Sequence, residues 1–243
     1  MRPMKKLLIL GLALLLAGGS FCNARAAARS SSNRGRDYVV GNTPMERWSC
    51  GIYAEEWTRD VMLRRYFPEA LEYSKIMAYA GYDLLPWLMT YAAVGNGGAS
   101  IGQDSSDDKV VYGLGLQINL MDHEVPYPGL MEDRLRINAA AEYLWAGTDW
   151  LGEEIKWGEF SSSLTVSIVN DLSGNVLFIP DTIAVYCGPI YSSVSGDEIS
   201  GDGRAGFGIA GGLEIFYSKR VSMHVQYNKL DHAGYSTGLN VRF

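Results

Sequence analysis

Residues 235–243 read Tyr-Ser-Thr-Gly-Leu-Asn-Val-Arg-Phe, and every second position of this stretch is large or apolar. The positions between them, such as Gly238, Asn240 and Arg242, are polar or lack bulk. Because successive side chains of a strand point to opposite faces, this pattern gives one apolar face and one polar face. The stretch is therefore predicted to be a strand with lipid or a core on one side and water on the other.

Nine further segments alternate in the same way along the chain. They cover approximately residues 48–55, 73–83, 86–95, 110–120, 135–145, 160–168, 183–187, 207–217 and 221–227. The segment 183–187 is the most ambiguous, because Pro189 lacks a backbone donor and is expected to mark a strand end or a bulge. Several segments are long enough for a tilted membrane strand, which needs about 9–11 residues. We therefore expect an all-β fold over residues 47–243: a closed, antiparallel, up-and-down transmembrane barrel of about ten strands, with eight as the alternative.

The connections between these segments fall into two groups. The links 96–108, 147–155 and 194–203 are rich in Gly, Ser, Asp and Glu, and with 60–72 and 229–233 they are predicted to form the outer loops. The links 83–85 and 218–220 are short, as periplasmic turns usually are. Two segments fit poorly on the periplasmic side, since 121–133 is long and 175–180 is apolar for a loop.

The amino-terminal residues predict export. Residues 1–6 are basic, residues 7–17 form an apolar run too short to span a bilayer, and Ala24-Arg25-Ala26 offers a cleavage site. We expect a signal peptide over 1–26 and a flexible leader over 27–46. The alternatives are lipidation at Cys22, disfavoured by the large Phe21 before it, and retention as a signal anchor.

The charge of the chain argues against a nucleic-acid partner. The formal net charge is −6, and removal of residues 1–26, which carry four basic side chains and no acid, makes it −10. Nucleic-acid binding requires basic surface. The sequence also lacks metal-ligand spacing and any dinucleotide or phosphate-binding motif, so no cofactor and no metal are expected.

Aromatic residues near the strand ends favour a membrane barrel over a soluble barrel or sandwich. Amphipathic rings gather at the headgroup level of membrane barrels. We expect such a girdle from Trp48 and Trp87 at the inner rim and from Trp57 and Trp145 at the outer rim. The opposite faces also carry Gly, Ala and Ser rather than the Lys, Glu and Thr of soluble strands.

The polar faces predict what fills the barrel. A charged cluster is expected in the lumen from these side chains: Arg134, Arg136, Glu142, Glu214, His224 and Arg242. A barrel of this size is filled by side chains or leaves a narrow passage, so the alternatives are a plug of ion pairs and a narrow channel. Cys50 and Cys187 are expected outside, on strands that are not neighbours, and should stay free thiols.

One constellation suggests catalysis. If Tyr217 and Val221 pair across a three-residue turn, Glu214 lies opposite His224, with Ser222 two residues away on the same face. Ser, His and Glu within reach of one another are the groups of nucleophilic catalysis. Interior polar packing is the favoured explanation, because all three face the lumen, and a barrel hydrolase is a remote alternative.

The carboxy-terminal stretch 206–243 (GFGIAGGLEIFYSKRVSMHVQYNKLDHAGYSTGLNVRF) resembles the closing strands of small outer-membrane β-barrels of the OmpA, OmpX and OmpW kind. The resemblance implies that Tyr235, Leu239, Val241 and Phe243 form a membrane-insertion signal. It also implies the outer membrane of a diderm bacterium as the location. The expected partners are outer-membrane lipid and the barrel-assembly machinery, and the protein is expected to be a monomer. Members differ in function, so we expect a structural or surface-interaction role without enzymatic activity, with a narrow diffusion channel for small solutes as the alternative.

Overall fold

The computed structural model describes residues 47–63, 67–101, 104–105, 108–125, 133–150, 153–171, 182–196, 199–201, 206–218 and 220–243. Ten long strands account for most of them. They are β1 (Trp48–Leu63), β2 (Phe67–Leu85), β3 (Leu88–Ile101), β5 (Lys109–Val125), β6 (Asp133–Trp150), β7 (Glu153–Asp171), β8 (Thr182–Gly196), β10 (Gly206–Phe216), β11 (Val221–Lys229) and β12 (Ala233–Arg242). Two short strands, β4 (Asp104–Ser105) and β9 (Ile199–Gly201), lie beside them.

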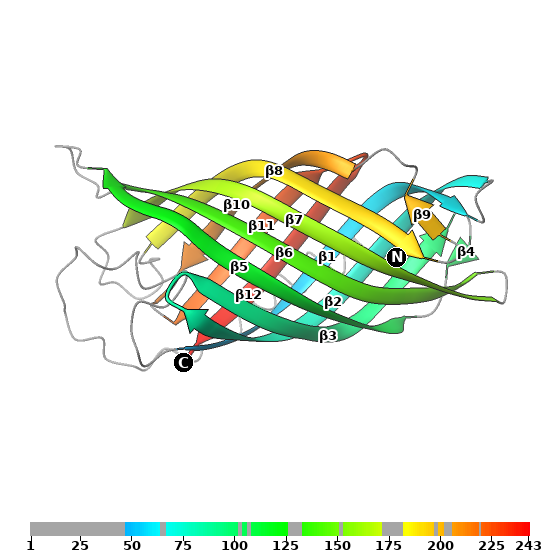
Figure 1. Cartoon of the computed structure of the whole chain (residues 1–243), viewed down its shortest axis with the longest axis horizontal. Helices are drawn as coiled ribbons and strands as arrows, with labels where there is room; N and C mark the ends of the chain where they lie inside the picture. The colour runs from blue at the N-terminus through cyan, green and yellow to red at the C-terminus, as the bar shows by residue number, and fades with distance from the viewer. Residues whose placement is uncertain are drawn as a thin grey trace.

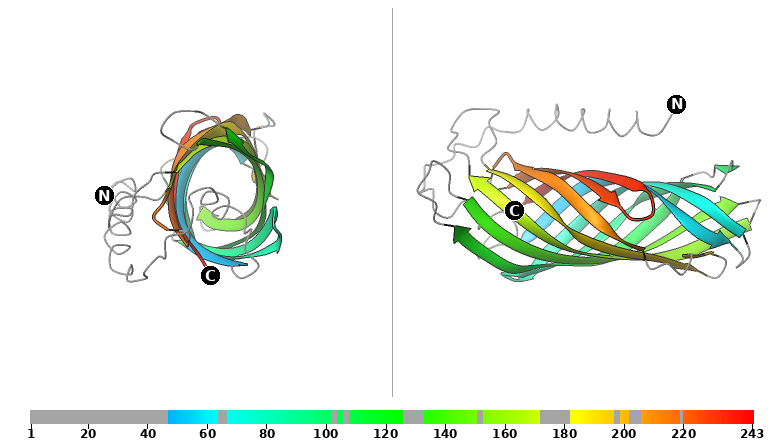
Figure 2. Two further views of the ribbon diagram at one scale, coloured as in Figure 1. Left: turned by 90° about the vertical axis from the view of Figure 1, so that its left-hand side faces the viewer. Right: turned by 90° about the horizontal axis from the view of Figure 1, so that it is seen from above.

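The ten long strands form a closed antiparallel barrel with up-and-down order (Figures 1 and 2). Each pairs with the next along the chain, and β12 pairs with β1 from Ser49↔Arg242 to Glu56↔Tyr235, which closes the ring. Backbone bonds between Trp48 and Phe243 continue this seam to the last residue. The predicted fold class and the count of ten strands are confirmed. We call the end that holds Trp48 and Phe243 the terminal end and the opposite end the distal end.

Most strands are longer than the alternation predicted. β1 runs to Leu63 and β2 starts at Phe67, so the segment 60–72 is mostly strand and not a loop. The segments 96–101, 147–150 and 194–196 likewise continue β3, β6 and β8. β5 reaches Val125, so the segment 121–133 begins as strand rather than as a turn, with a bulge between Asn119 and Met121. The segment 175–180, the signal peptide and the leader lie outside the described residues.

Pro189 lies inside a strand, contrary to the expectation that it ends one or marks a bulge. β8 continues through it to Gly196, and Pro189 pairs with Ile209 of β10. On the other side the pairing with β7 is interrupted between Ser163↔Ile190 and Val166↔Cys187, and the register is the same on both sides of the gap. Because proline cannot donate a backbone hydrogen bond, the strand loses part of one ladder and keeps its course.

The barrel wall is tall on one side and low on the other. β2 and β7 have 19 residues each, whereas β11 has 9. With about 3.3 Å per residue and a tilt of about 40°, these lengths correspond to heights of roughly 48 Å and 23 Å. At the distal end β9 pairs with both β8 and β1, and so joins the two tall flanks above the short strands.

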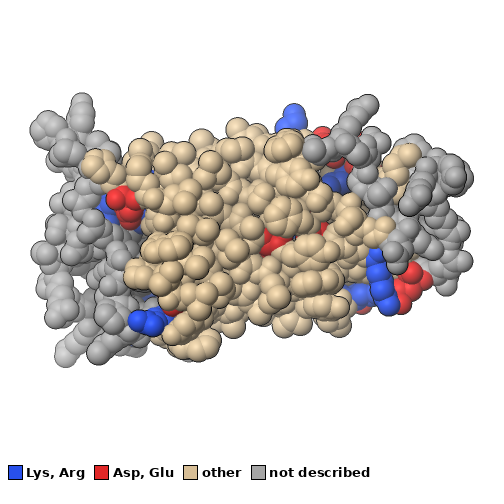
Figure 3. Space-filling view, viewed as in Figure 1, with Lys and Arg blue, Asp and Glu red and all other residues tan. Residues whose placement is uncertain are grey.

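The side chains on the outer wall change character along its height. Around the terminal and middle parts the outward positions are large and apolar, including Ile76, Leu116, Leu164 and Val225. We call this zone the apolar belt; Figure 3 shows it as a broad, mostly tan area. Toward the distal end the outward positions become polar, as at Asp60, Glu72, Glu154 and Lys156.

Two further observations concern the described residues. Cys50 and Cys187 are free and lie on β1 and β8, which are not neighbours, as predicted. Among the described residues, no helix has the length and apolar character needed to cross a membrane.

Candidate functional site in the barrel lumen

Pairs of glycine and tyrosine shape the inner wall. Gly51 of β1 lies opposite Tyr79 of β2, and Gly115 of β5 lies opposite Tyr91 of β3. A Cβ atom at either glycine would collide with the ring of its partner, so each ring covers the backbone of its glycine. Because the two rings lie flat over these glycines, they do not extend into the centre of the barrel. The centre of the barrel therefore keeps an open space.

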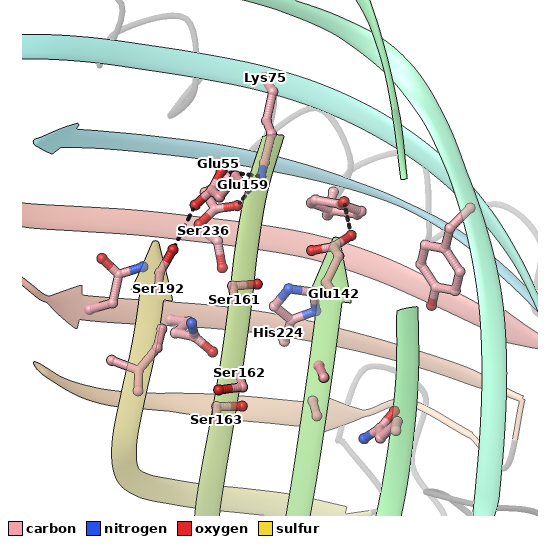
Figure 4. A pocket seen from close by; sticks show the side chains of 18 of the residues that line it. Glu55, Lys75, Glu142, Glu159, Ser161, Ser162, Ser163, Ser192, His224 and Ser236 are labelled. Carbon is pink, nitrogen blue, oxygen red and sulfur yellow. Dashed lines mark hydrogen bonds and ion pairs between the residues drawn. The ribbon is translucent and has the colours of Figure 1, made fainter. Parts of the chain in front are cut away.

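That space is a polar chamber of about 270 Å³ in the middle of the barrel. Side chains from many strands line it (Figure 4), and the charged ones are Glu55, Arg59, Lys75, Glu142 and Glu159. Tyr53, Tyr79 and Tyr91 add aromatic surface, and His224, Gln226 and Asn228 of β11 form one polar edge. The chamber continues along β11 as far as Leu230, which follows the distal end of that strand.

Two of the three carboxylates in the chamber form ion pairs with basic side chains. Lys75 is almost fully buried, and its Nζ lies 2.9 Å from Glu55 and 3.9 Å from Glu159. The guanidinium of Arg59 donates to Glu159 at 3.1 Å and lies 4.7 Å from the ring of Trp57. Ser192 also donates to Glu159, at 3.1 Å. Two basic side chains therefore neutralise Glu55 and Glu159.

Glu142 has a different environment. Its Oε1 accepts a hydrogen bond of 2.9 Å from the hydroxyl of Tyr53. Within the described part of the chain, no basic side chain makes an ion pair with it at 4 Å or less. The chamber thus holds three carboxylates and two basic groups.

Toward the distal end most inward positions are apolar, although Arg59, Lys75 and Glu159 lie among them. The inward positions that were polar at mid-height become large and hydrophobic, and they pack into one cluster that we call the apolar cap. Its members are Trp57, Val61, Leu71, Tyr73, Met77, Ala93, Ala99, Ile101, Val111, Leu144, Ala146, Ile155, Trp157 and Val194. All of them come from β1 to β8, so the cap fills the tall side of the barrel, while the chamber extends beside it along β11.

Below the chamber, at the terminal end, buried ion pairs close the lumen. Arg242 of β12 binds Asp83 of β2, and both side chains are at most 4% exposed. Arg136 of β6 lies 3.2 Å from Asp122 of β5. Phe216, Val169 and Ala184 form a small apolar cluster at the same end. Truncation of one partner of such a buried pair leaves a charge without compensation, so these contacts fix the closed arrangement.

The six side chains predicted for the lumen all point inward, but they do not form one cluster. Glu142 and His224 line the chamber. Arg134, Arg136 and Arg242 are buried at the terminal end. Glu214 lies opposite His224 in the predicted register, and its Oε1 accepts a hydrogen bond from Ser222 at 3.0 Å.

The arrangement of Ser222, His224 and Glu214 does not match that of a nucleophile and its base. The hydroxyl of Ser222 donates to the carboxylate of Glu214 and not to the imidazole of His224. Catalysis by such a triad requires the histidine between the other two groups. The described ranges also contain no group of three or more His, Cys, Asp or Glu side chains that could hold a metal ion.

The predicted aromatic girdle needs one correction. Trp48, Trp87 and Trp145 point outward and are between 37% and 53% exposed. Trp57 is only 2% exposed and packs inside the apolar cap, 5.2 Å from the ring centroid of Tyr73. It faces inward because the apolar positions of β1 change from even to odd numbers beyond Glu55, so Trp57 cannot contact lipid headgroups.

The four residues of the predicted insertion signal lie on one face. Tyr235, Leu239 and Val241 occupy outward positions of β12, and Phe243 follows them at the terminal end. Their role in insertion stays a prediction.

Several important residues were missed by the sequence analysis. Arg59, Lys75 and Glu159 lie at inward positions of segments that were assigned to loops or to strand ends. Asp83 was assigned to a turn and Asp122 to a periplasmic link, although both pair with predicted lumen arginines. A signal was available in the sequence: Lys75 is an even number of positions from Tyr79, and Glu159 from Ser161, so each shares a strand face with a residue that faces the lumen.

The fold defines a class of protein, a closed ten-stranded up-and-down barrel, and comparisons with known proteins add little to it. No family model matches the chain, so membership in the OmpA, OmpX or OmpW families is not shown, and no curated protein matches it either.

Three solved structures with a similar fold are distant in sequence. An outer membrane channel from Pseudomonas putida F1 has 10% identity, with 89% of this chain and 100% of that chain covered and a TM-score of 0.43. The translocator domain of the autotransporter NalP from Neisseria meningitidis has 8% identity, with 97% and 95% covered and a TM-score of 0.33. The CymD monoaromatic hydrocarbon channel has 9% identity, with 81% and 88% covered and a TM-score of 0.25. At these values none of the three carries an argument about what this chain does.

Proposed function

We propose that this chain is an outer-membrane β-barrel of a diderm bacterium, with its terminal end toward the periplasm. The apolar belt supports this proposal, because a closed barrel with apolar outward positions satisfies every backbone group inside a bilayer. The height of the short strand β11, roughly 23 Å, also agrees with the apolar band of about 25 Å of such barrels. The tall flanks, with polar outward positions, would then project beyond the membrane.

We further propose that the barrel has a structural or surface-interaction role and is not an enzyme. The observation that favours a structural role over a channel is the closed terminal end, where Arg242 and Asp83 are buried together and Arg136 contacts Asp122. A lumen that is closed on this side gives solutes no continuous path. The distal end instead offers a firm rim with exposed charges to the outside.

The rim charges are organised around Lys109. Its Nζ lies 2.6 Å from Asp149 and 3.2 Å from Glu154, and Lys156 lies 3.0 Å from Glu154. The hydrogen bond with Asp149 raises the pKa of Lys109, and the hydrogen bond with Lys156 lowers the pKa of Glu154. Both groups therefore keep their charge at neutral pH, and the rim presents a fixed pattern to a surface partner.

Single-channel recording in a planar bilayer tests the closed state. The wild-type barrel should show no steady conductance. The double variant Asp83→Ala with Arg242→Ala removes both charges of the closing pair and should produce open-channel steps. The matched control is Glu154→Gln on the rim, which should stay silent. Steady conductance of the wild type would refute the structural role.

A narrow diffusion channel is the second candidate. The polar chamber favours it, because the space runs from mid-barrel to the distal end of β11. In that case the ion pairs at the terminal end act as a gate, and the wild type should conduct in the same recording.

A further inference from the structure

We propose that the chamber is a binding site for a small organic cation, of the quaternary ammonium or amine class. This inference goes beyond the surface role, and it rests on the chamber rather than on the closed terminal end. A barrel that conducts and a barrel that is closed could both bind such a ligand, so the two proposals fail independently.

The chamber holds one more carboxylate than basic side chains. Arg59 and Lys75 neutralise Glu55 and Glu159, while Glu142 has only the hydroxyl of Tyr53 as a partner in the described part of the chain. A carboxylate in a confined space is costly unless it is paired. A ligand with one positive charge completes the pairing, whereas an anion would add to the excess of negative charge.

A second carboxylate near Glu142, that of Glu159, is only partly compensated. The side chain of Glu159 is 5% exposed, and its Oε2 has no hydrogen-bond partner. Lys75 lies 3.9 Å from this oxygen, which is too long for a hydrogen bond. Figure 4 shows Glu159 on the strand next to that of Glu142, with Ser161 to Ser163 continuing the same strand. This oxygen is sealed from solvent, so it acts on a ligand through its charge, which adds to the negative potential of the chamber.

Aromatic rings add a surface that suits a cation. Tyr53, Tyr79 and Tyr91 line the chamber, and Tyr53 contacts Glu142. The ring centroids are 6.3 Å apart for Tyr53 and Tyr79 and 5.8 Å apart for Tyr79 and Tyr91. Aromatic faces attract weakly hydrated cations, and several rings around a carboxylate are the usual environment for a quaternary ammonium group. These rings distinguish an organic cation from a metal ion, which would need several oxygen ligands at short range.

Access also fits a ligand from outside. The chamber is closed below by the pair of Arg242 and Asp83, and it continues past Gln226 and Asn228 to Leu230 at the distal end. A volume of about 270 Å³ accommodates a small organic molecule, and the charged and polar lining suits such a solute better than an apolar lipid tail. A small solute from the distal side therefore fits the site better than a membrane lipid.

Isothermal titration calorimetry with choline tests the proposal, on the full mature barrel folded in detergent micelles. The neutral probe is 3,3-dimethylbutan-1-ol, which has the shape of choline without its charge. Choline should bind saturably and the alcohol should not. Glu142→Gln should weaken choline binding at least tenfold, and Glu154→Gln, the rim control, should leave it unchanged.

A second pair of variants keeps the test valid if Glu142→Gln does not fold, which heat-modifiable migration on SDS gels reports. Tyr91→Phe retains an aromatic face and should keep most of the affinity, whereas Tyr91→Leu should reduce it severalfold. Equal binding of choline and the alcohol, absence of saturable heat, or unchanged affinity in folded Glu142→Gln would each overturn the proposal.

Discussion

Replacing Leu144 by asparagine tests whether the distal interior of the barrel is a packed core or a hydrated lumen. Leu144 is 1% exposed within the apolar cap. Loss of a buried leucine typically costs about 2–5 kcal/mol through lost transfer energy and the cavity left behind. The asparagine amide would lie opposite Glu159 of β7, whose Oε2 has no hydrogen-bond partner, so a new hydrogen bond would offset part of this cost. Leu144→Asn is therefore expected to lower the free energy of unfolding by about 2 kcal/mol or more.

The matched control lies four residues away, on the same face of the strand. Ala140 faces inward on the same strand, β6, and lines the polar chamber. Ala140→Asn should change the free energy of unfolding by no more than about 1 kcal/mol, because the new amide finds water and polar side chains there. Urea unfolding of the barrel in phospholipid vesicles, followed by tryptophan fluorescence, gives both values. Equal and small penalties for the two variants would mean that water fills the distal interior, and the apolar cap would then be wrong.

Three further predictions concern the outer face. Val225→Arg should lower the free energy of unfolding by about 2–4 kcal/mol at a mid-bilayer site, clearly more than Gln226→Arg in the lumen, and a reversed order would contradict the assigned facing. Mass spectrometry of the unreduced protein should find no bond between Cys50 and Cys187, as β1 and β8 are not adjacent, and such a bond would contradict the strand order. Phe243→Asp should lower the amount of folded protein in the outer-membrane fraction, because Phe243 ends the seam with Trp48, and normal levels would remove this residue from the insertion signal.

The sequence predicted the strands well where polarity stays constant along each face. In residues 206–243 the large apolar positions keep one numbering parity apart from Phe216 and Leu230, so facing, turn and the register of Glu214 with His224 followed directly. Alternation of period two reports which residues share a face. It shows whether that face points outward or into the barrel only if the outside stays apolar and the interior stays polar along the whole strand.

The longer strands break that condition. On β7 the apolar residues Phe160, Leu164 and Ile168 face outward, whereas Ile155 and Trp157 face inward with the opposite parity. The alternation of apolar and polar residues changes its numbering parity at this point. In the sequence this change looks like the end of the strand, so the distal parts of the strands were assigned to loops. Trp57 was misassigned for the same reason. The ion pairs of the chamber could not be predicted, because they join strands that are distant along the chain, as for Arg59 of β1 and Glu159 of β7.

The inversion of the two faces would fix the depth of the barrel in a membrane. If the barrel sank toward its terminal end, Glu72 and Asp60 would enter the hydrocarbon, and if it rose, Leu84 and Leu120 would leave it for water. Charged outward positions cost little near the interface and several times more toward the midplane, so the restoring free energy grows with each ångström of displacement. Since the change of polarity runs around β1, β2, β6 and β7, it opposes tipping as well as vertical motion. The distal rim would thus be held at a constant height above the lipid surface.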